Sequence, residues 1–176
     1  MDDDARPARI DAWFRAYGDR VFAYLLHRTD RETAQDLLQE VFVTAFRKAD
    51  DLPEPPIGWL LGTARRLLAN STRGERRRVR LALRVAADTP FPPVEDDTAE
   101  GAVATALAEL SSADREVLTL SAWYELSADE AARALGCSPT AYTVRLHRAR
   151  RRLAERLRLA GYSAYRVDPQ PEAIHE

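Results

Sequence analysis

A segment near the C-terminal end of the chain constrains its fold most strongly. Residues 127–153 read SADEAARALGCSPTAYTVRLHRARRRL. Ser127 can cap a short helix over 128–135, and Gly136 favours the end of that helix. Ser138 and Pro139 are residue types that begin helices, so we expect a second helix from about 139 to 153. A short helix, a tight turn and a longer helix form the helix-turn-helix arrangement.

The longer helix combines one apolar face with several basic ones. Its apolar residues recur at helical spacing, at Tyr142, Leu146, Ala149 and Leu153. The positions left to face base edges are Thr143, Val144 and His147. Better placed for phosphates or guanine are Arg145, Arg148 and Arg151. At the start of the helix, Ser138 and Thr140 can add backbone N–H contacts to phosphate. For His147, a base contact and a phosphate contact both stay open. The segment therefore predicts DNA recognition in the major groove.

The basic charge of the chain is concentrated in two places. The formal net charge is −2, and Lys48 is the only lysine among 26 basic residues. Residues 65–84 hold eight arginines and one acid, Glu75, and residues 133–158 also hold eight arginines and one acid, Glu155. A single cluster of this kind is equally well explained as a solvated helix face. Two clusters, one of them on a helix-turn-helix, favour nucleic acid as the partner.

Hydrophobic periodicity predicts an all-α fold of two small helical domains joined by an extended acidic linker. In the first domain we expect helices over 10–28, from a cap at Asp30 to about Ala49, and from about Ile57 into the arginine run. Prolines exclude a regular element from 50–56 and from the acidic segment 87–98. The expected boundaries are 10–86 for the first domain, 87–99 for a flexible linker, 100–159 for a second domain of four helices, and 160–176 for a mobile tail.

Composition argues against several classes of protein. The N-terminus lacks the pattern of a signal peptide, and no stretch approaches the roughly 18 apolar residues that span a bilayer, so we expect a cytoplasmic protein with no membrane insertion. Cys137 is the only cysteine, and the three histidines lack metal-ligand spacing, so no metal or cofactor is expected. A helical nuclease or phosphodiesterase would need paired carboxylates or converging metal ligands. Neither occurs, and we expect no enzyme and no small-molecule substrate.

Three motifs resemble those of bacterial sigma factors of the extracytoplasmic-function group, the small two-domain members of the sigma-70 family. Residues 36–42, DLLQEVF, are similar to the D-x-x-Q-E-x-F helix of region two. Residues 58–66, GWLLGTARR, are similar to the W-L-x-x-x-A-R stretch that precedes a basic run. The region-four pattern is matched by Leu110, REVL at 115–118, LS at 126–127, EAA at 130–132 and LHRAR at 146–150. The resemblance covers residues 10–158.

The resemblance implies a mechanism of promoter-specific transcription initiation. Region two would dock on a coiled coil of the β′ subunit of core RNA polymerase and melt the −10 promoter element. Region four would sit on the flap of the β subunit and read the −35 element through the helix-turn-helix residues named above. The residues that would bind core polymerase are Asp36, Gln39, Glu40 and Val43, which share one helical face by their spacing. A polar, acidic face of this kind suits arginines on a partner.

Contacts to the −10 element would come from the proline-rich loop and the helix after it. An unpaired base must be held in a pocket, and the displaced strand on a basic surface. The candidates are Leu52, Trp59, Arg65, Arg66, Asn70, Arg73, Arg76, Arg77 and Arg78. For Trp59, core packing is the favoured interpretation. Position 66 departs from many family members, which have asparagine there, and this leaves the base preference at −10 open.

Other partners and alternatives follow from the same patterns. The family usually has a dedicated anti-sigma factor, so such a partner is expected. The acidic linker suits either a strand in an RNA path or a solubilising spacer. The principal alternative is a stand-alone helix-turn-helix regulator, which would need only the C-terminal domain and normally a dimer. A module that sequesters another factor is disfavoured by the arginine-loaded helix.

Overall fold

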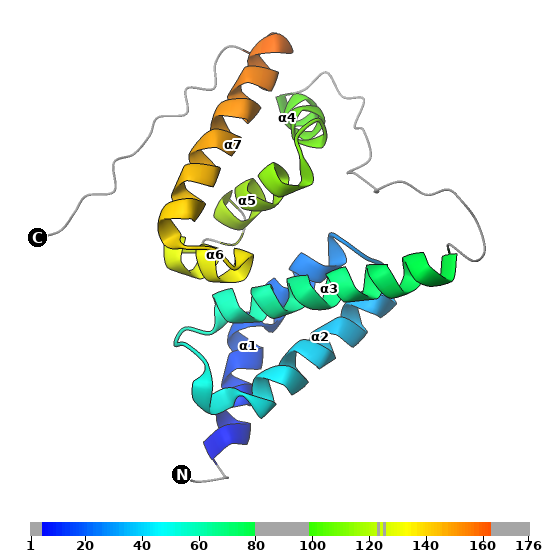
Figure 1. Cartoon of the computed structure of the whole chain (residues 1–176), viewed down its shortest axis with the longest axis vertical. Coiled ribbons are helices and arrows are strands. Elements are labelled where there is room, and N and C mark those ends of the chain that lie inside the picture. Colours follow the sequence, from blue (N-terminus) through cyan, green and yellow to red (C-terminus); the bar gives the residue numbers. More distant parts are fainter. Residues whose placement is uncertain (1–4, 80–98, 123, 125, 163–176) are drawn as a thin grey trace, which may run out of the picture. The chain divides into compact units, whose positions relative to one another are not determined.

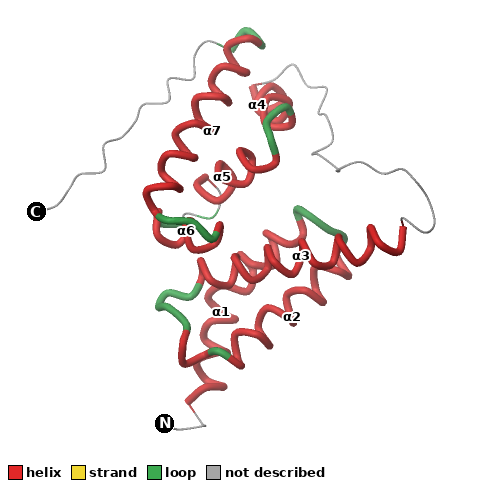
Figure 2. Tube along the Cα trace, viewed as in Figure 1, coloured by secondary structure: helices red, strands yellow, loops and turns green. Residues whose placement is uncertain are grey.

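The structure is a computed structural model that describes residues 5–79, 99–122, 124 and 126–162. Within that part, the chain forms seven α-helices and one short 3-10 helix, and no strand occurs (Figures 1 and 2). The predicted all-α fold is confirmed. The helices fall into two compact units that differ from a simple division into an N-terminal and a C-terminal half.

Three long helices form the body of the first unit. They are α1 (Ala5–Leu26), α2 (Arg31–Arg47) and α3 (Ile57–Val79), with the 3-10 helix η1 (Ala49–Asp51) between α2 and α3. Each of the three packs against the other two. Their core consists of fully buried apolar side chains: Val21, Tyr24 and Leu25 of α1, Ala34, Val41 and Ala45 of α2, and Ile57, Leu60, Leu61 and Ala64 of α3.

Local chemistry explains where α2 begins. The Asp30 carboxylate accepts a hydrogen bond from the Thr33 backbone N–H at 2.9 Å, as an N-cap residue does. This hydrogen bond, with a second from the Thr33 hydroxyl, lowers the pKa of Asp30 from its ordinary value. The predicted cap is confirmed. The helix ends at Arg47, two residues before the predicted end, because Lys48 to Asp51 turn into η1.

The first unit also contains α6 (Ala128–Leu135), which packs on α3. The buried residues of α6 are all small: Ala131, Ala132 and Ala134. On α3, Gly58 and Gly62 face backbone atoms of α6, at Glu130 and at Arg133 and Ala134 respectively. Because both partners of the contact are small residues, the two helix backbones come close together.

The second unit contains α4 (Ala99–Ala108), α5 (Ser112–Ala122) and α7 (Pro139–Leu159) from Thr143 onward. Leu110, Leu118 and Ala149 form its core, and Leu107, Leu146 and Leu153 pack against them. The apolar face predicted for residues 139–153 is therefore confirmed. The four predicted helices of the C-terminal region are present as α4 to α7.

The predicted linker and tail fall largely outside the described residues, and the first helix is longer than predicted. Most of the linker predicted at 87–99 and most of the tail predicted at 160–176 lie outside the described residues, and the domain boundaries stay predictions. The first helix starts at Ala5, five residues before the predicted start. Its additional turn carries Arg6 and Arg9, whose guanidinium groups bind Asp50 and so give the extra turn a tertiary anchor.

Candidate polymerase and nucleic-acid interfaces

The exposed face of α2 carries the four residues predicted to bind core polymerase. Asp36, Gln39, Glu40 and Val43 are all exposed, and the side chain of Val43 is 48% accessible. Leu37 and Val41, between them in sequence, are buried in the core. Helical spacing thus sets three polar groups and one exposed valine on one continuous surface.

Two aromatic rings add apolar area beside this face. Phe46 follows Phe42 by one helical turn and is 41% exposed. Phe14 of α1 is 47% exposed, and its ring and that of Phe42 form an edge-type pair with centroids 5.0 Å apart. A protein interface typically has an apolar centre and a polar rim, and this surface offers both kinds of group.

The loop between α2 and α3 is tied to α1 by a cluster of charges. Arg9 donates a hydrogen bond to one carboxylate oxygen of Asp50 at 2.8 Å, and Arg6 donates to the other oxygen. The hydrogen bonds from Arg6 and then Arg9 hold the pKa of Asp50 below its ordinary value. Leu52, the predicted pocket residue, directly follows η1 and is half-buried. The cluster therefore fixes the start of the loop that holds Leu52.

The helix α3 presents the remaining residues predicted for the −10 element. Arg65, Arg66 and Asn70 are exposed, and Arg66 donates a hydrogen bond to the buried Thr63 hydroxyl at 2.9 Å. Trp59 is half-buried. The other arginines predicted here are Arg73, Arg76, Arg77 and Arg78; α3 continues through them to Val79, and their side chains lie outside the described part.

The helix-turn-helix forms as the sequence predicts. The Ser127 hydroxyl accepts a hydrogen bond from the Glu130 N–H, and the Glu130 carboxylate accepts one from the Ser127 N–H at 2.8 Å, which is a capping box. Gly136 ends α6 in the left-handed conformation with φ 67°, and the Cys137 N–H donates to the Ala132 carbonyl at 2.9 Å. The Ser138 hydroxyl then accepts from the Ala141 N–H and caps α7.

The faces of α7 separate structural residues from candidate DNA contacts. Tyr142 and Ala149 are buried. The predicted contact residues of this helix are exposed: Thr140, Thr143, Val144, Arg145, His147, Arg148 and Arg151. Ser138, which precedes the helix, is exposed too. The structure thus brings the whole predicted −35 set onto the accessible surface of one helix and its cap.

Two arginines near the end of α7 have a different role. Arg152 forms an ion pair with Asp114 at 2.7 Å, and Arg156 forms one with Glu109 at 2.9 Å. Both pairs hold α7 to the chain segment that contains α4 and α5. Arg145 and Arg148, by contrast, form no ion pair with a carboxylate in the part of the chain that the structure describes. The basic run therefore contains both structural arginines and arginines available to phosphate.

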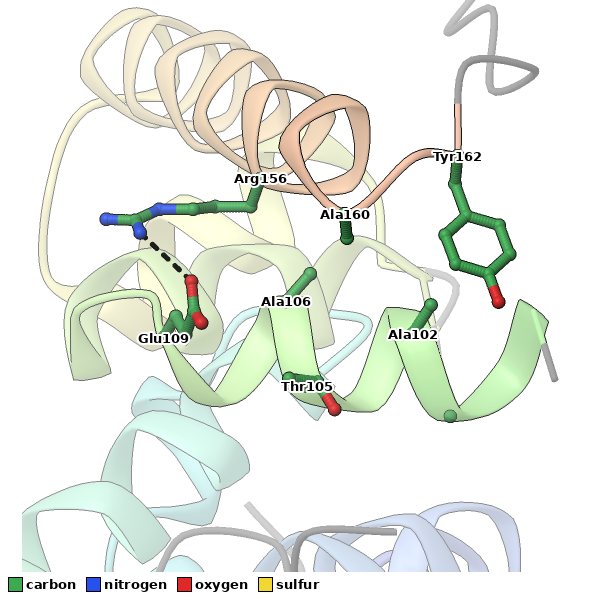
Figure 3. A pocket seen from close by; sticks show the side chains of 8 residues that line it. Ala102, Thr105, Ala106, Glu109, Arg156, Ala160 and Tyr162 are labelled. Carbon is green, nitrogen blue, oxygen red and sulfur yellow. Dashed lines mark hydrogen bonds and ion pairs between the residues drawn. The ribbon is translucent and has the colours of Figure 1, made fainter. Parts of the chain in front are cut away.

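A small hollow lies between α4 and the end of α7 (Figure 3). Its volume is about 160 Å³, and Thr105, Glu109, Arg156 and Tyr162 supply its polar groups. Ligand pockets are typically about 300–1,000 Å³, so we assign no ligand to this hollow. In the described residues, no group of three or more histidine, cysteine, aspartate or glutamate side chains could hold a metal ion. No helix within the described ranges is both long and apolar enough to cross a bilayer.

Sequence reasoning missed three contacts of the first unit. One is the binding of Arg6 and Arg9 to Asp50. The second is the close approach of α6 to Gly58 and Gly62 on α3. The third joins α1 to the segment before α6, where Arg20 donates a hydrogen bond to the Tyr124 carbonyl. The spacing of two glycines four residues apart was a usable signal for the second contact, whereas long-range pairing of charges and carbonyls leaves no periodic pattern.

Comparisons with known proteins agree with this architecture. The family model described as Sigma-70 region 2 matches residues 13–78, and the one described as Sigma-70, region 4 matches residues 100–153. No curated protein matches the chain.

Solved structures share the fold. The sigma factor RpoE in complex with the anti-sigma factor NepR from Bartonella quintana is 24% identical, with a TM-score of 0.62, over 83% of this chain and 94% of RpoE. CnrH in complex with the cytosolic domain of CnrY is also 24% identical, with a TM-score of 0.54, over 85% of this chain and 88% of CnrH.

The two family models lie in the order expected from the three sequence motifs and together span most of the chain. The surfaces described above fall within them: the α2 face and α3 in region 2, and the helix-turn-helix in region 4. The chain therefore belongs to the sigma-70 family, non-enzymatic factors that bind RNA polymerase and direct transcription from promoters.

Proposed function

We propose that this chain is a cytoplasmic sigma factor of the extracytoplasmic-function group that uses the exposed α2 face for core polymerase and α7 for the −35 element. One observation supports this most directly. A single chain carries both an exposed polar face on α2 and an exposed basic face on a capped helix-turn-helix. A regulator that only binds an operator would need the second surface but not the first.

The α2 surface supports docking on the β′ subunit. Asp36 and Glu40 supply carboxylates that can pair with arginines of a partner, and Gln39 supplies an amide. Val43 and Phe46 supply exposed apolar area on the same helix. Burying this apolar area would favour association with core polymerase. The charged groups would orient the two surfaces and increase the rate of association.

The loop at Leu52 and the basic helix α3 support capture of the −10 element. Opening a duplex without ATP requires that unpaired bases be held as they leave the stack. A half-buried leucine in a loop anchored through Asp50 offers a fixed apolar contact for such a base. The exposed Arg65, Arg66 and Asn70, with the four arginines further along α3, offer charge and hydrogen bonds to the separated strand.

The helix α7 supports reading of the −35 element in the major groove. Thr143, Val144 and His147 can reach base edges, and Arg145, Arg148 and Arg151 can reach phosphates or guanine. Ser138 and Thr140 lie at the N-terminal end of the helix, where backbone N–H groups are available to a phosphate.

An inhibitory partner is part of the proposal. Two solved structures of this fold are sigma factors in complexes: RpoE with NepR, and CnrH with the cytosolic domain of CnrY. We infer that a dedicated anti-sigma factor holds this chain inactive in a similar way.

A contact between region 4 of this chain and the flap of the β subunit is also part of the proposal. It rests on the family resemblance alone.

A transcription assay separates this function from that of a stand-alone regulator. The purified chain is added to core polymerase and a library of promoter fragments, with core polymerase alone and the chain alone as controls. We expect specific transcripts only when both are present, and no specific DNA binding by the chain as a dimer. Tight, dimeric DNA binding without core polymerase, with no specific transcript, would favour the regulator instead.

A further inference from the structure

The first residues of α1 reach the loop that is predicted to hold a −10 base. Arg9 donates a hydrogen bond to one carboxylate oxygen of Asp50 at 2.8 Å, and Arg6 donates to the other. The two arginines share one face of α1 by their three-residue spacing. Asp50 lies two positions before Leu52, the predicted pocket residue. This cluster therefore joins the start of one helix to the loop that follows another.

Arg9 is itself held against the core of the first unit. Its guanidinium lies 5.3 Å from the centroid of the Trp13 ring, one helical turn further along α1, and Trp13 is only 5% exposed. Asp50 thus binds a group that rests on a buried aromatic ring. The hydrogen bonds from Arg6 and then Arg9 lower the pKa of Asp50, so the carboxylate is ionised at neutral pH. The anchor is therefore formed under the conditions in which the chain would meet a promoter.

Buried residues on either side restrict where Leu52 can lie. Before it, Ala49 is 2% exposed, and the Asp51 N–H donates a hydrogen bond to the Lys48 carbonyl at 2.9 Å. After it, Pro56 is fully buried. Two of the four residues between position 51 and position 56 are prolines, whose φ angle is restricted. The position of Leu52 therefore follows from where η1 is held, and the side chain of Asp50 ties η1 to another helix.

The negative charge of Asp50 needs a physical reason at this place. A carboxylate two positions from a base-binding residue repels the phosphates of an incoming strand. The side chains of Arg6, Arg9 and Asp50 are 35%, 40% and 36% exposed, and ion pairs with such exposure contribute little to the stability of a whole domain. A binding group, by contrast, must be held within about 0.5 Å of its productive position. Anchoring of the loop therefore explains the cluster better than global stability does.

We propose that Arg6 and Arg9 are positioning residues for the −10 element, which act through Asp50 to fix the loop that presents Leu52. The proposal rests on the function proposed above, in which Leu52 receives an unpaired base. It gives the start of α1 a role in promoter opening, although that part of the chain carries none of the predicted DNA contacts. The anchoring itself is a property of the free chain and can be measured without DNA.

The anchoring is tested in the free chain by amide hydrogen exchange followed by NMR. The protection factor of the Asp51 N–H should fall about two- to fivefold in Asp50→Asn and in the double variant Arg6→Gln/Arg9→Gln. Arg15→Gln is the matched control, because Arg15 pairs with Asp11 within α1, and it should leave the protection factor unchanged. Unchanged protection in both anchor variants would overturn the anchoring.

The positioning is tested by open-complex formation with core polymerase, followed through 2-aminopurine fluorescence in the −10 element. If only charge mattered, Asp50→Asn would remove a repelling carboxylate and open the promoter faster. If Asp50 anchors the loop, the same substitution should slow opening by about two- to fivefold. Asp51→Asn is the matched control: Asp51 is exposed and forms no ion pair in the described part of the chain, so opening should not slow. Faster opening by Asp50→Asn would overturn the positioning.

A combined variant separates positioning from direct contact of the arginines with DNA. Arg6→Gln/Arg9→Gln should slow opening as Asp50→Asn does, and the triple variant should be no slower than the double one, because all three groups act as one unit. Arg6→Lys/Arg9→Lys keeps both charges and should recover most of the rate. A further loss in the triple variant relative to Asp50→Asn would show that the arginines bind DNA themselves, which would overturn the proposal.

Two further measurements distinguish positioning from a general loss of structure. Affinity for core polymerase, which depends on the α2 face, should stay unchanged in the anchor variants. Transcription of a library randomised at −10 should show a weaker base preference with them than with the parent. Reduced core affinity together with an unaltered base preference would indicate a merely structural role and overturn the positioning. A parent chain that opens no promoter with core polymerase would defeat the proposed function and the positioning role with it, whereas lowered protection would still establish the anchor.

Discussion

Arg152 donates hydrogen bonds from one guanidinium nitrogen to both carboxylate oxygens of Asp114, at 2.7 and 2.8 Å, and so joins α7 to α5. Arg148 lies one turn earlier on the same helix and is exposed. Two arginines four residues apart in one basic run therefore have different environments. Composition alone would treat them as equivalent, yet one is held within the fold and the other is available to a ligand.

The two arginines should respond differently to truncation. Arg148→Ala should weaken promoter binding nearly uniformly across sequences and lower the slope of log affinity against log salt by about 1, because one phosphate contact is lost. Arg152→Ala should leave that slope unchanged and lower the free energy of unfolding by up to about 1 kcal/mol, as for an exposed ion pair. Salt-dependent binding and urea denaturation of both variants provide the measurements. Equal salt slopes for the two variants would contradict the division.

His147 and Thr143 should set the preference for −35 bases. A base contact in the major groove is worth about 1–3 kcal/mol of discrimination, so His147→Ala should tolerate changed −35 bases with moderate loss of activity. The measurement is transcription of a promoter library randomised at −35, with Arg148→Ala as the comparison. A sequence preference that changes with Arg148→Ala and stays unchanged with His147→Ala would reverse the two roles.

The exposed α2 face should carry core binding. Replacing Gln39 and Glu40 together by alanine should weaken binding to core polymerase by about 10- to 100-fold, roughly 1.4–3 kcal/mol, and leave the fold intact. Asp19→Asn, which removes an exposed carboxylate on α1, is the control and should bind normally. Competition for core polymerase against the parent gives the affinities. A double variant that competes as well as the parent would place the docking surface elsewhere.

The Asp50 cluster predicts a dependence of stability on acid pH. The pKa of Asp50 is lower in the folded chain than its ordinary value of about 3.9, so the native state favours the ionised carboxylate. The stabilisation is therefore present above about pH 4 and is lost as the pH falls through the folded pKa. Asp50→Asn should be less stable than the parent at neutral pH, and the difference should shrink on acidification.

Thermal unfolding of the parent and Asp50→Asn across this pH range tests the expectation. Adding Arg6→Gln and Arg9→Gln to Asp50→Asn serves as the control, because the arginines have then already lost their carboxylate partner. These additions should not restore the acid dependence. A difference between parent and Asp50→Asn that is constant with pH would show that ionisation of Asp50 contributes nothing.

Local sequence signals predicted most of the helices and the helix-turn-helix. Asp30, Ser127 and Gly136 act within a few residues of their own position, so their effects can be recognised without a three-dimensional structure. The apolar face of α7 was predictable for the same reason, since Tyr142 and Ala149 follow the helical period. The membership in the sigma-70 family followed from three motifs in a fixed order.

What could not be predicted depends on contacts between distant parts of the chain. The start of α1 was placed too late because Arg6 and Arg9 are anchored by Asp50, about forty positions away, and no periodicity records such a pairing. Phe14 follows the apolar repeat of α1 yet is 47% exposed, because periodicity identifies a face but not whether another element covers it. The roles of individual residues at −10, at −35 and on α2 stay predictions.

The close approach at Gly58 has a consequence for how this contact would be found in related sequences. A side chain at position 58 would meet backbone atoms of Glu130, and every amino acid has those atoms. No replacement in α6 could make room for a larger residue on α3. The two positions therefore have no reason to vary together, and covariation between homologues would not reveal the contact even where selection maintains it.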